Sequence, residues 1–205
     1  MPIHALLTLA SALVLLLQPT AAAAQALSKG AKESDYLVTV WAAARFAADG
    51  TVESLRFSTV VEHPTAFLDQ VRPVLLRARI PPAEHEGRPA VLDTGMRVTI
   101  SISPAQQSFR IANLSLQPLP LRTFSPASPE LQHDSTPGRF TVDASCVVSI
   151  IGRCKDVSLQ SQGNPPEAFR RNVREAFGRW EFEPQRVNGQ AIEGKAKMGF
   201  QLVIE

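Results

Sequence analysis

The sequence predicts an α+β fold of two tandem β-β-α-β units, each a small antiparallel sheet with one helix packed on one face. The chain aligns with itself without a gap at a shift of 102 residues, from Thr39 on Thr141 to Ile102 on Ile204. Each copy also has the same order of patterns: two alternating apolar stretches around a glycine, one helical stretch, and a last alternating stretch. One helix on one sheet face is a common way to bury such surfaces.

The repeat sets the predicted domain boundaries. The first copy is residues 35–103 and the second copy is residues 138–205. Between them, residues 104–137 form a proline-rich linker in which the apolar alternation of residues 108–116 suggests an extra strand. Residues 27–34 form a short lead before the first copy.

Residues 1–26 are interpreted as a signal peptide. The apolar run at residues 5–17 is shorter than the about 20 residues that a membrane-spanning helix needs. It is followed by small residues that end in Ala24-Gln25-Ala26, a pattern typical of signal cleavage. The expected location is therefore the periplasm, and an uncleaved signal would instead anchor the chain in the inner membrane.

Each copy is expected to begin with a β-hairpin. Residues 36–46 alternate in polarity, and residues 52–59 return after a turn in which Gly50 can take a positive φ. In the second copy, residues 140–150 and 154–160 have the same roles around Gly152. Each copy also ends in an alternating strand, so its sheet is expected to be antiparallel.

A helix is expected after each hairpin. In the second copy Asn164 is a candidate N-cap, and apolar residues then follow at helical spacing up to Trp180. In the first copy, Pro73 falls inside the equivalent stripe. A proline there removes a backbone hydrogen bond and clashes with the preceding turn, so we expect a kinked, shortened or later-starting helix.

The predicted core of the second copy closes where the helix passes into the next strand. Trp180 ends the helical stripe, Phe182 follows on an extended backbone and can point the same way, and Pro184 prevents further helix. The first copy has Ala78 and Ile80 at the first two of these positions, which predicts a smaller and less stable core. The structural core signature is Phe169, Val173, Trp180, Phe182 and Pro184.

This signature resembles that of a known family, the C-terminal domain of TonB. The resemblance rests on a strand, a glycine turn, a second strand, the pattern F-x3-V-x2-A-x3-W-x-[FY]-x-P, and Asn-Gly before a last strand. The second copy matches over nearly its whole length and the first copy more weakly. The resemblance implies a module of the Gram-negative envelope that binds an extended segment of a partner, such as an outer-membrane TonB-dependent transporter, by β-strand addition and takes part in transmembrane transport.

The resemblance places partner binding on the last strand, as a sheet edge with unpaired N–H and C=O groups. The residues of this predicted edge are Lys197, Met198, Gly199, Phe200, Gln201, Leu202, Val203 and Ile204. Edge strands of this kind also allow a homodimer. The alternative function is a structural or cell-wall-associated envelope module with no role in energy transduction.

No catalytic residue, cofactor or metal site is predicted. The four histidines are scattered without ligand spacing, and no nucleophile elbow, phosphate loop or dinucleotide fingerprint is present. The formal net charge is only +2 and no basic stripe is visible, which argues against a nucleic-acid partner. These observations favour a binding protein over an enzyme.

Cys146 and Cys154 are a candidate disulfide in an exported chain. A hairpin turn centred near Gly152 places them on the same face of neighbouring strands, as diagonal neighbours. Diagonal positions are about 7–8 Å apart, slightly beyond the usual Cα separation of about 4.4–6.8 Å for a disulfide. Both outcomes therefore stay open, and a bulge near the turn would allow the bond.

Overall fold

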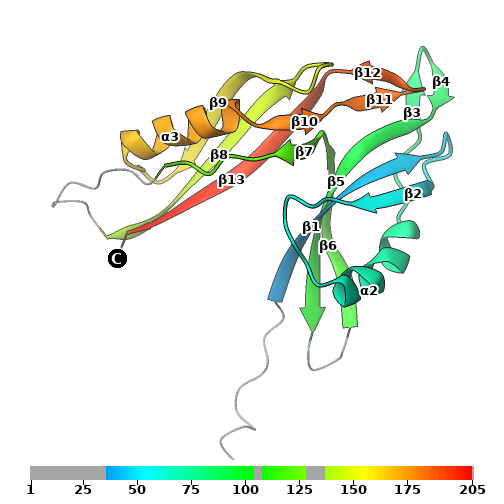
Figure 1. The fold of residues 1–205 in the computed structure, drawn as a ribbon, viewed down its shortest axis with the longest axis horizontal. Coiled ribbons are helices and arrows are strands. Elements are labelled where there is room, and N and C mark those ends of the chain that lie inside the picture. The colour runs from blue at the N-terminus through cyan, green and yellow to red at the C-terminus, as the bar shows by residue number, and fades with distance from the viewer. Residues whose placement is uncertain (1–35, 104–107, 128–136, 205) are drawn as a thin grey trace, which may run out of the picture. The chain divides into compact units, whose positions relative to one another are not determined.

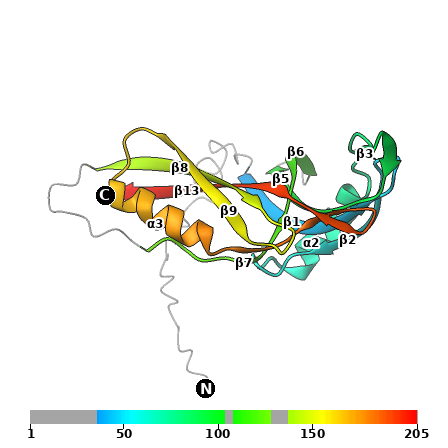
Figure 2. The ribbon, with the colours of Figure 1, turned by 90° about the horizontal axis from the view of Figure 1, so that it is seen from above.

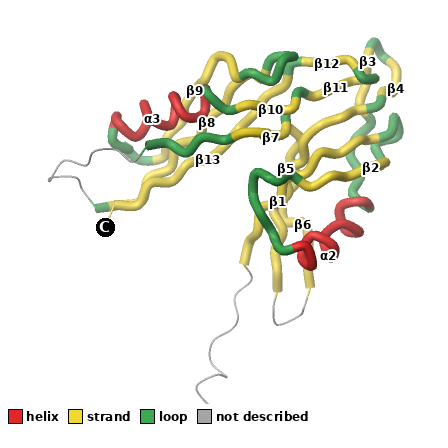
Figure 3. The backbone as a smooth tube through the Cα atoms, viewed as in Figure 1, coloured by secondary structure: helices red, strands yellow, loops and turns green. Residues whose placement is uncertain are grey.

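The structure is a computed structural model that describes residues 36–103, 108–127 and 137–204. The predicted signal peptide and the lead that follows it lie outside the described residues. Strand and bridge residues make up 59% of the described part and helices 15%, so the molecule is mostly β (Figure 3). The prediction of an α+β fold with two β-β-α-β units is therefore wrong.

The first half contains one helix and several strands (Figure 1). In chain order they are β1 (Tyr36–Phe46), β2 (Val52–Phe57), α2 (Thr65–Leu76), β3 (Ala83–His85), β4 (Arg88–Ala90) and β5 (Leu92–Ser103). Two strands follow in the segment predicted as a linker, β6 (Ser108–Gln117) and β7 (Leu119–Arg122).

The second half also contains one helix, and it has more short strands. Its elements are β8 (Gly138–Val148), β9 (Cys154–Gln162), α3 (Glu167–Gly178), β10 (Glu181–Glu183), β11 (Gln185–Val187), β12 (Gln190–Ile192) and β13 (Gly194–Ile204). The elements β8, α3 and β13 begin 102 residues after β1, α2 and β5 respectively. The internal repeat is therefore preserved in the backbone.

The helix starts differ from the sequence expectation in both halves. Helix α2 spans as many residues as α3 and starts at the equivalent position, so the expectation of a shortened or later-starting helix is wrong. Pro73 lies in its exposed part. The N-caps are Pro64 and Pro166 with no side-chain hydrogen bond, so Asn164 is not the cap.

The sheets explain why two separate units do not describe the fold. The largest sheet has the order β12-β11-β5-β1-β2, with β6 also paired to β5, so strands of the second half extend the sheet of the first. Strand β10 pairs with β7 from the linker segment. Asn188 fastens β11 and β12 in place, because its Oδ1 accepts from Val91 N at 3.0 Å and its N donates to Val91 O at 2.9 Å. The unpaired backbone groups of β5 are satisfied in this way.

Two hydrophobic cores lie under the two helices. One is formed by α2 against β1 and β5, with Phe46, Leu75 and Met96 among its buried members. The other is formed by α3 against the three-stranded sheet β13-β8-β9, and α3 runs along β8 and β9 (Figure 2). Phe182, from β10, is buried in this second core.

Candidate partner-binding edge

Strand β13 is paired along only one side. It forms a continuous antiparallel ladder with β8, from Gly194 opposite Val148 to Ile204 opposite Gly138. Among the described residues, no strand pairs with its other side. The strand on which the sequence placed partner binding is thus an edge strand of the β13-β8-β9 sheet.

One hydrogen bond identifies which backbone groups of β13 face away from β8. Lys197 N donates to the side-chain Oε1 of Gln117 at 2.9 Å, and Gln117 belongs to β6 rather than β8. In an antiparallel ladder, residues alternate between those bonded to the partner strand and those facing outward. Gly199, Gln201 and Val203 have the parity of Lys197 and therefore direct their N–H and C=O groups outward. We call these three residues the open edge.

The open edge lacks the usual protection against strand pairing. Natural edges are commonly blunted by lysines, prolines, bulges or a covering element. Lysines occur only at the start of β13, where Lys197 Nζ lies 3.6 Å from Asp143 Oδ2. Residues 198–204 contain no charge and no proline, and Val203 is 52% exposed. This part of β13 is available to an incoming strand.

The first half fills the equivalent edge with its own chain. Strand β6 pairs antiparallel with β5, from Gly95 opposite Gln117 to Ser103 opposite Ser108. The shift of 102 residues places the open edge of β13 on the part of β5 that β6 covers. The two copies therefore have the same edge in two states, one occupied and one open.

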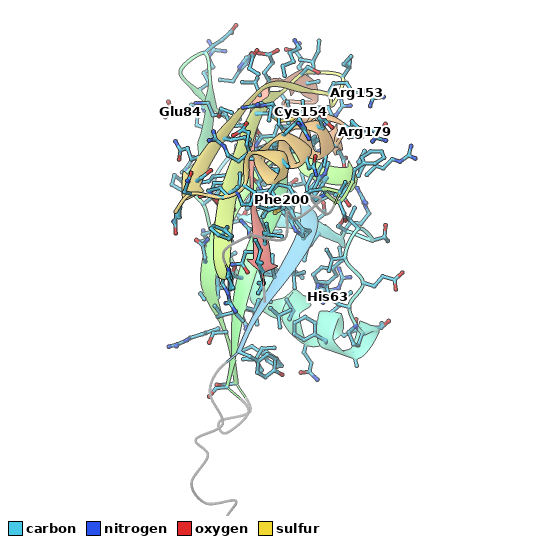
Figure 4. The ribbon with its side chains drawn as sticks, turned by 90° about the vertical axis from the view of Figure 1, so that its left-hand side faces the viewer. His63, Glu84, Arg153, Cys154, Arg179 and Phe200 are labelled. Atoms are coloured by element: carbon cyan, nitrogen blue, oxygen red, sulfur yellow. A yellow bond between two sulfur atoms is a disulfide. The ribbon has the colours of Figure 1, made fainter. Side chains whose placement is uncertain are left out.

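The side chains beside the two edges differ in burial accordingly. On β5, Met96 and Val98 are fully buried and Ile100 is only 3% exposed. Their counterparts on β13, which are Met198, Phe200 and Leu202, are only partly buried against the second core. Figure 4 labels Phe200 on this strand. An apolar strip next to the open edge is thus incompletely covered, and its burial would favour a bound strand.

The core signature lies behind this edge. Phe169, Val173, Trp180 and Phe182 are buried, and the rings of Phe177 and Trp180 each lie about 6 Å from that of Phe200. Pro184 is half-buried and follows β10. The signature supports the strand that carries the edge, and it provides packing rather than partner contacts.

Sequence reasoning missed Phe124, which ties the linker segment to the second core. Trp180 Nε1 donates to Phe124 O at 2.9 Å, and the guanidinium carbon of Arg179 lies 4.3 Å from the centroid of the Phe124 ring. Asn172 Nδ2 also donates to Ala127 O at 2.9 Å. An aromatic between prolines was the available signal. The second half is therefore built with part of the linker, and binding experiments require the whole chain.

Cys146 and Cys154 form a disulfide, with their Cα atoms 5.7 Å apart. The β8–β9 register shifts between Ser145 and Val147, so Cys146 lies at a bulge. The bulge brings the two cysteines closer than regular diagonal neighbours would be. The bond joins the two strands next to β13 at the end near the Gly152 turn.

The unfolded, non-reduced protein is expected to have no titratable thiol. Reduction is expected to lower the free energy of unfolding by about 2–3 kcal/mol, since the bond closes a short loop. Denaturant unfolding with and without reductant measures this, and a Cys146→Ser/Cys154→Ser variant, which should not respond to reductant, is the control. Two free thiols in the exported protein would contradict the prediction.

A second concave region lies on the outer face of the large sheet, with a volume of about 390 Å³. Its charged side chains are engaged with each other: Arg45 contacts Asp93 at 3.2 Å, and Arg56 contacts Glu183 at 3.0 Å. Arg186 Nη1 donates to Gly189 O. This groove is a network of exposed ion pairs, and it offers a ligand less than the open edge does.

Other kinds of site were sought in the described residues. They contain no group of three or more histidine, cysteine, aspartate or glutamate side chains that could hold a metal ion. None of the helices in this part of the chain is both long and apolar enough to cross a membrane. The open edge remains the feature with the clearest capacity to bind a partner.

A comparison with protein-family models finds no match for this chain, and a search of curated proteins finds no match either.

Proposed function

We propose that this protein is a periplasmic interaction module that binds an extended segment of an envelope partner at the open edge of β13 by β-strand addition. The observation that carries the proposal is the contrast between the two copies. The edge that β6 occupies on β5 is unoccupied by any described strand on β13. Backbone groups at such an edge gain hydrogen bonds from an added strand, and neighbouring side chains provide specificity.

The partner class follows from the resemblance to the C-terminal domain of TonB. That resemblance rests on the signature around Trp180, Phe182 and Pro184. We propose an outer-membrane transporter as the partner and a role in transmembrane transport. Recovery of outer-membrane barrels with the whole chain from envelope extract would support this role. Recovery of cell-wall fragments alone would favour a cell-wall-associated module instead.

Gln201→Pro is expected to abolish binding of transporter amino-terminal peptides. Proline removes the N–H of Gln201, which faces outward from β13 and is not part of the ladder with β8. Gln201→Ala is the matched control and should bind nearly as the unchanged protein does, because main-chain groups carry the interaction. Affinity of the unchanged protein should be modest, since the peptide loses chain entropy when it becomes ordered.

The measurement is a titration of the isotope-labelled whole chain, with amide shifts followed for each residue. Shifts should cluster on Gly199, Gln201 and Val203 and on the β8 residues behind them. Melting curves of both variants establish that they are folded. Shifts confined to α3, with the open edge unchanged, would contradict the proposed site.

A further inference from the structure

We infer that the partner segment binds antiparallel to β13 and places a large apolar side chain, best an aromatic one, in a hollow between the end of β13 and the start of α3. This inference rests on the proposed function and adds the direction and side-chain pattern of the partner. It is drawn from the filled edge of the first half.

The direction follows from β6. Its first residue, Ser108, pairs with Ser103 at the end of β5, and its last residue, Gln117, pairs with Gly95 near the start. Shifted by 102 residues, the amino-terminal end of a partner segment would lie beside Ile204. Its carboxyl-terminal end would point toward Lys197, whose outward N–H is already bonded to Gln117. That bond sets a natural limit to the added strand.

The aromatic position follows from Phe109 of β6. Phe109 pairs with Ile102, and its ring packs edge-on against Phe67 of α2 with centroids 6.0 Å apart. The shift of 102 residues converts Ile102 to Ile204 and Phe67 to Phe169. The second half has no described strand in the position of β6, and thus no counterpart of Phe109.

A hollow of about 360 Å³ lies at the corresponding place in the second half. Phe140 and Ile204 border it from the sheet, Pro166 borders it from the N-cap of α3, and Glu167 and Arg170 border it from the helix itself. Glu167 Oε2 and Arg170 Nη1 are 3.7 Å apart. The hollow thus offers apolar contacts from the sheet and a polar rim from the helix.

The remaining side-chain pattern follows from the same strand. Four apolar side chains of β6 pack on the first core, and they are Phe109, Ile111, Leu114 and Leu116. Their partly buried counterparts on the edge strand of the second half, Phe200 and Leu202, need the same kind of cover. The partner segment is therefore expected to alternate apolar and polar residues. A uniformly charged segment would leave this apolar strip exposed.

The probe for this inference is a peptide with the sequence of residues 108–115, added to the isotope-labelled whole chain. The chain's own β6 is not displaced at micromolar peptide, because an intramolecular strand acts at an effective concentration of about millimolar. A nitroxide at the amino end of the peptide should broaden the amide signals of Val203 and Ile204. A nitroxide at the carboxyl end should broaden those of Gly199 instead.

Peptide variants test the hollow without disturbing the protein. Phe109→Ala in the probe should weaken binding about tenfold to a hundredfold, because a buried aromatic contact is lost. Asn113→Ala is the control, since Asn113 is exposed in β6 and should change affinity less than about twofold. A silent Phe109→Ala would overturn the assignment of the hollow.

The outcomes separate this inference from the proposed function. Broadening of Gly199 by the amino-terminal label would mean parallel entry, which overturns the inference and leaves strand addition intact. The same holds if transporter peptides shift the open edge and the probe does not. If neither shifts it, the proposed function fails as well. Edge shifts that depend on protein concentration without peptide would make a second copy of this chain the occupant and overturn the inference.

Discussion

Trp180→Ala is expected to lower the free energy of unfolding by about 3–5 kcal/mol, because it opens a large cavity in the second core. Trp180 is only 6% exposed, and its ring lies 5.2 Å from that of Phe177. Its Nε1 also donates to Phe124 O. The substitution therefore removes both packing against α3 and the hydrogen bond that holds the linker segment. Against a total of about 5–15 kcal/mol for a domain, such a loss should partly unfold the protein.

Denaturant unfolding followed by circular dichroism measures the effect. Trp180→Phe is the matched variant, since it keeps an aromatic ring but leaves the buried carbonyl of Phe124 without its donor. It should cost less, about 1–3 kcal/mol. Trp41 remains in both variants as a fluorescent reporter of the first half, where it is 5% exposed. An unchanged unfolding curve for Trp180→Ala would mean that this side chain is exposed in solution.

Much of the local structure could be predicted from the sequence. The hairpins, the helices and the buried signature around Trp180 depend on periodicity and turn residues within short windows. The repeat added a further constraint, because each copy supported the assignment of the other. The start of α2 was the main local error. The cost of Pro73 was overestimated because Pro73 lies at an exposed position of a helix whose buried face, with Val71 and Leu75, is complete.

The pairing of strands between the halves could not be predicted in this way. The positions of β11 beside β5 and of β7 beside β10 depend on contacts between residues far apart in the chain. Short strands such as Gln185–Val187 carry too few residues for a periodicity signal. The fold class failed for this reason, since it treated the segment after each helix as a connection rather than as part of a shared sheet.

The candidate site shows the same limit. The resemblance identified β13 as an edge, but sequence alone could not establish that β6 covers the equivalent edge of β5. The occupied copy is what gives the open edge its direction and side-chain pattern. Phe109 was noticed only as part of a candidate strand, and its role as a template became visible through its contact with Phe67.

Gly152→Ala is the second substitution with a large expected effect, about 2–5 kcal/mol of lost stability. Gly152 has a φ of +77° in the β8–β9 turn, and a Cβ there would lie 2.0 Å from Phe182 O. Its own carbonyl accepts from Phe182 N at 2.9 Å, so the turn and β10 are in direct backbone contact. Gly50 has the same relation to Ile80 in the first half. A side chain at Gly152 would add backbone strain, about 1–3 kcal/mol, and force apart the turn and the strand that carries Phe182.

Gly189→Ala is the matched control, because Gly189 has a similar φ of +81° but has nothing within 4 Å of the position of a Cβ. It should cost only the left-handed backbone term, about 1–2 kcal/mol. The difference between the two variants in thermal or denaturant unfolding, with the Cys146–Cys154 bond intact, isolates the close approach to Phe182. Equal losses would mean that the turn does not contact β10 in solution. A larger loss for Gly152→Ala would establish that the turn glycine positions the Trp180–Phe182 segment behind the open edge.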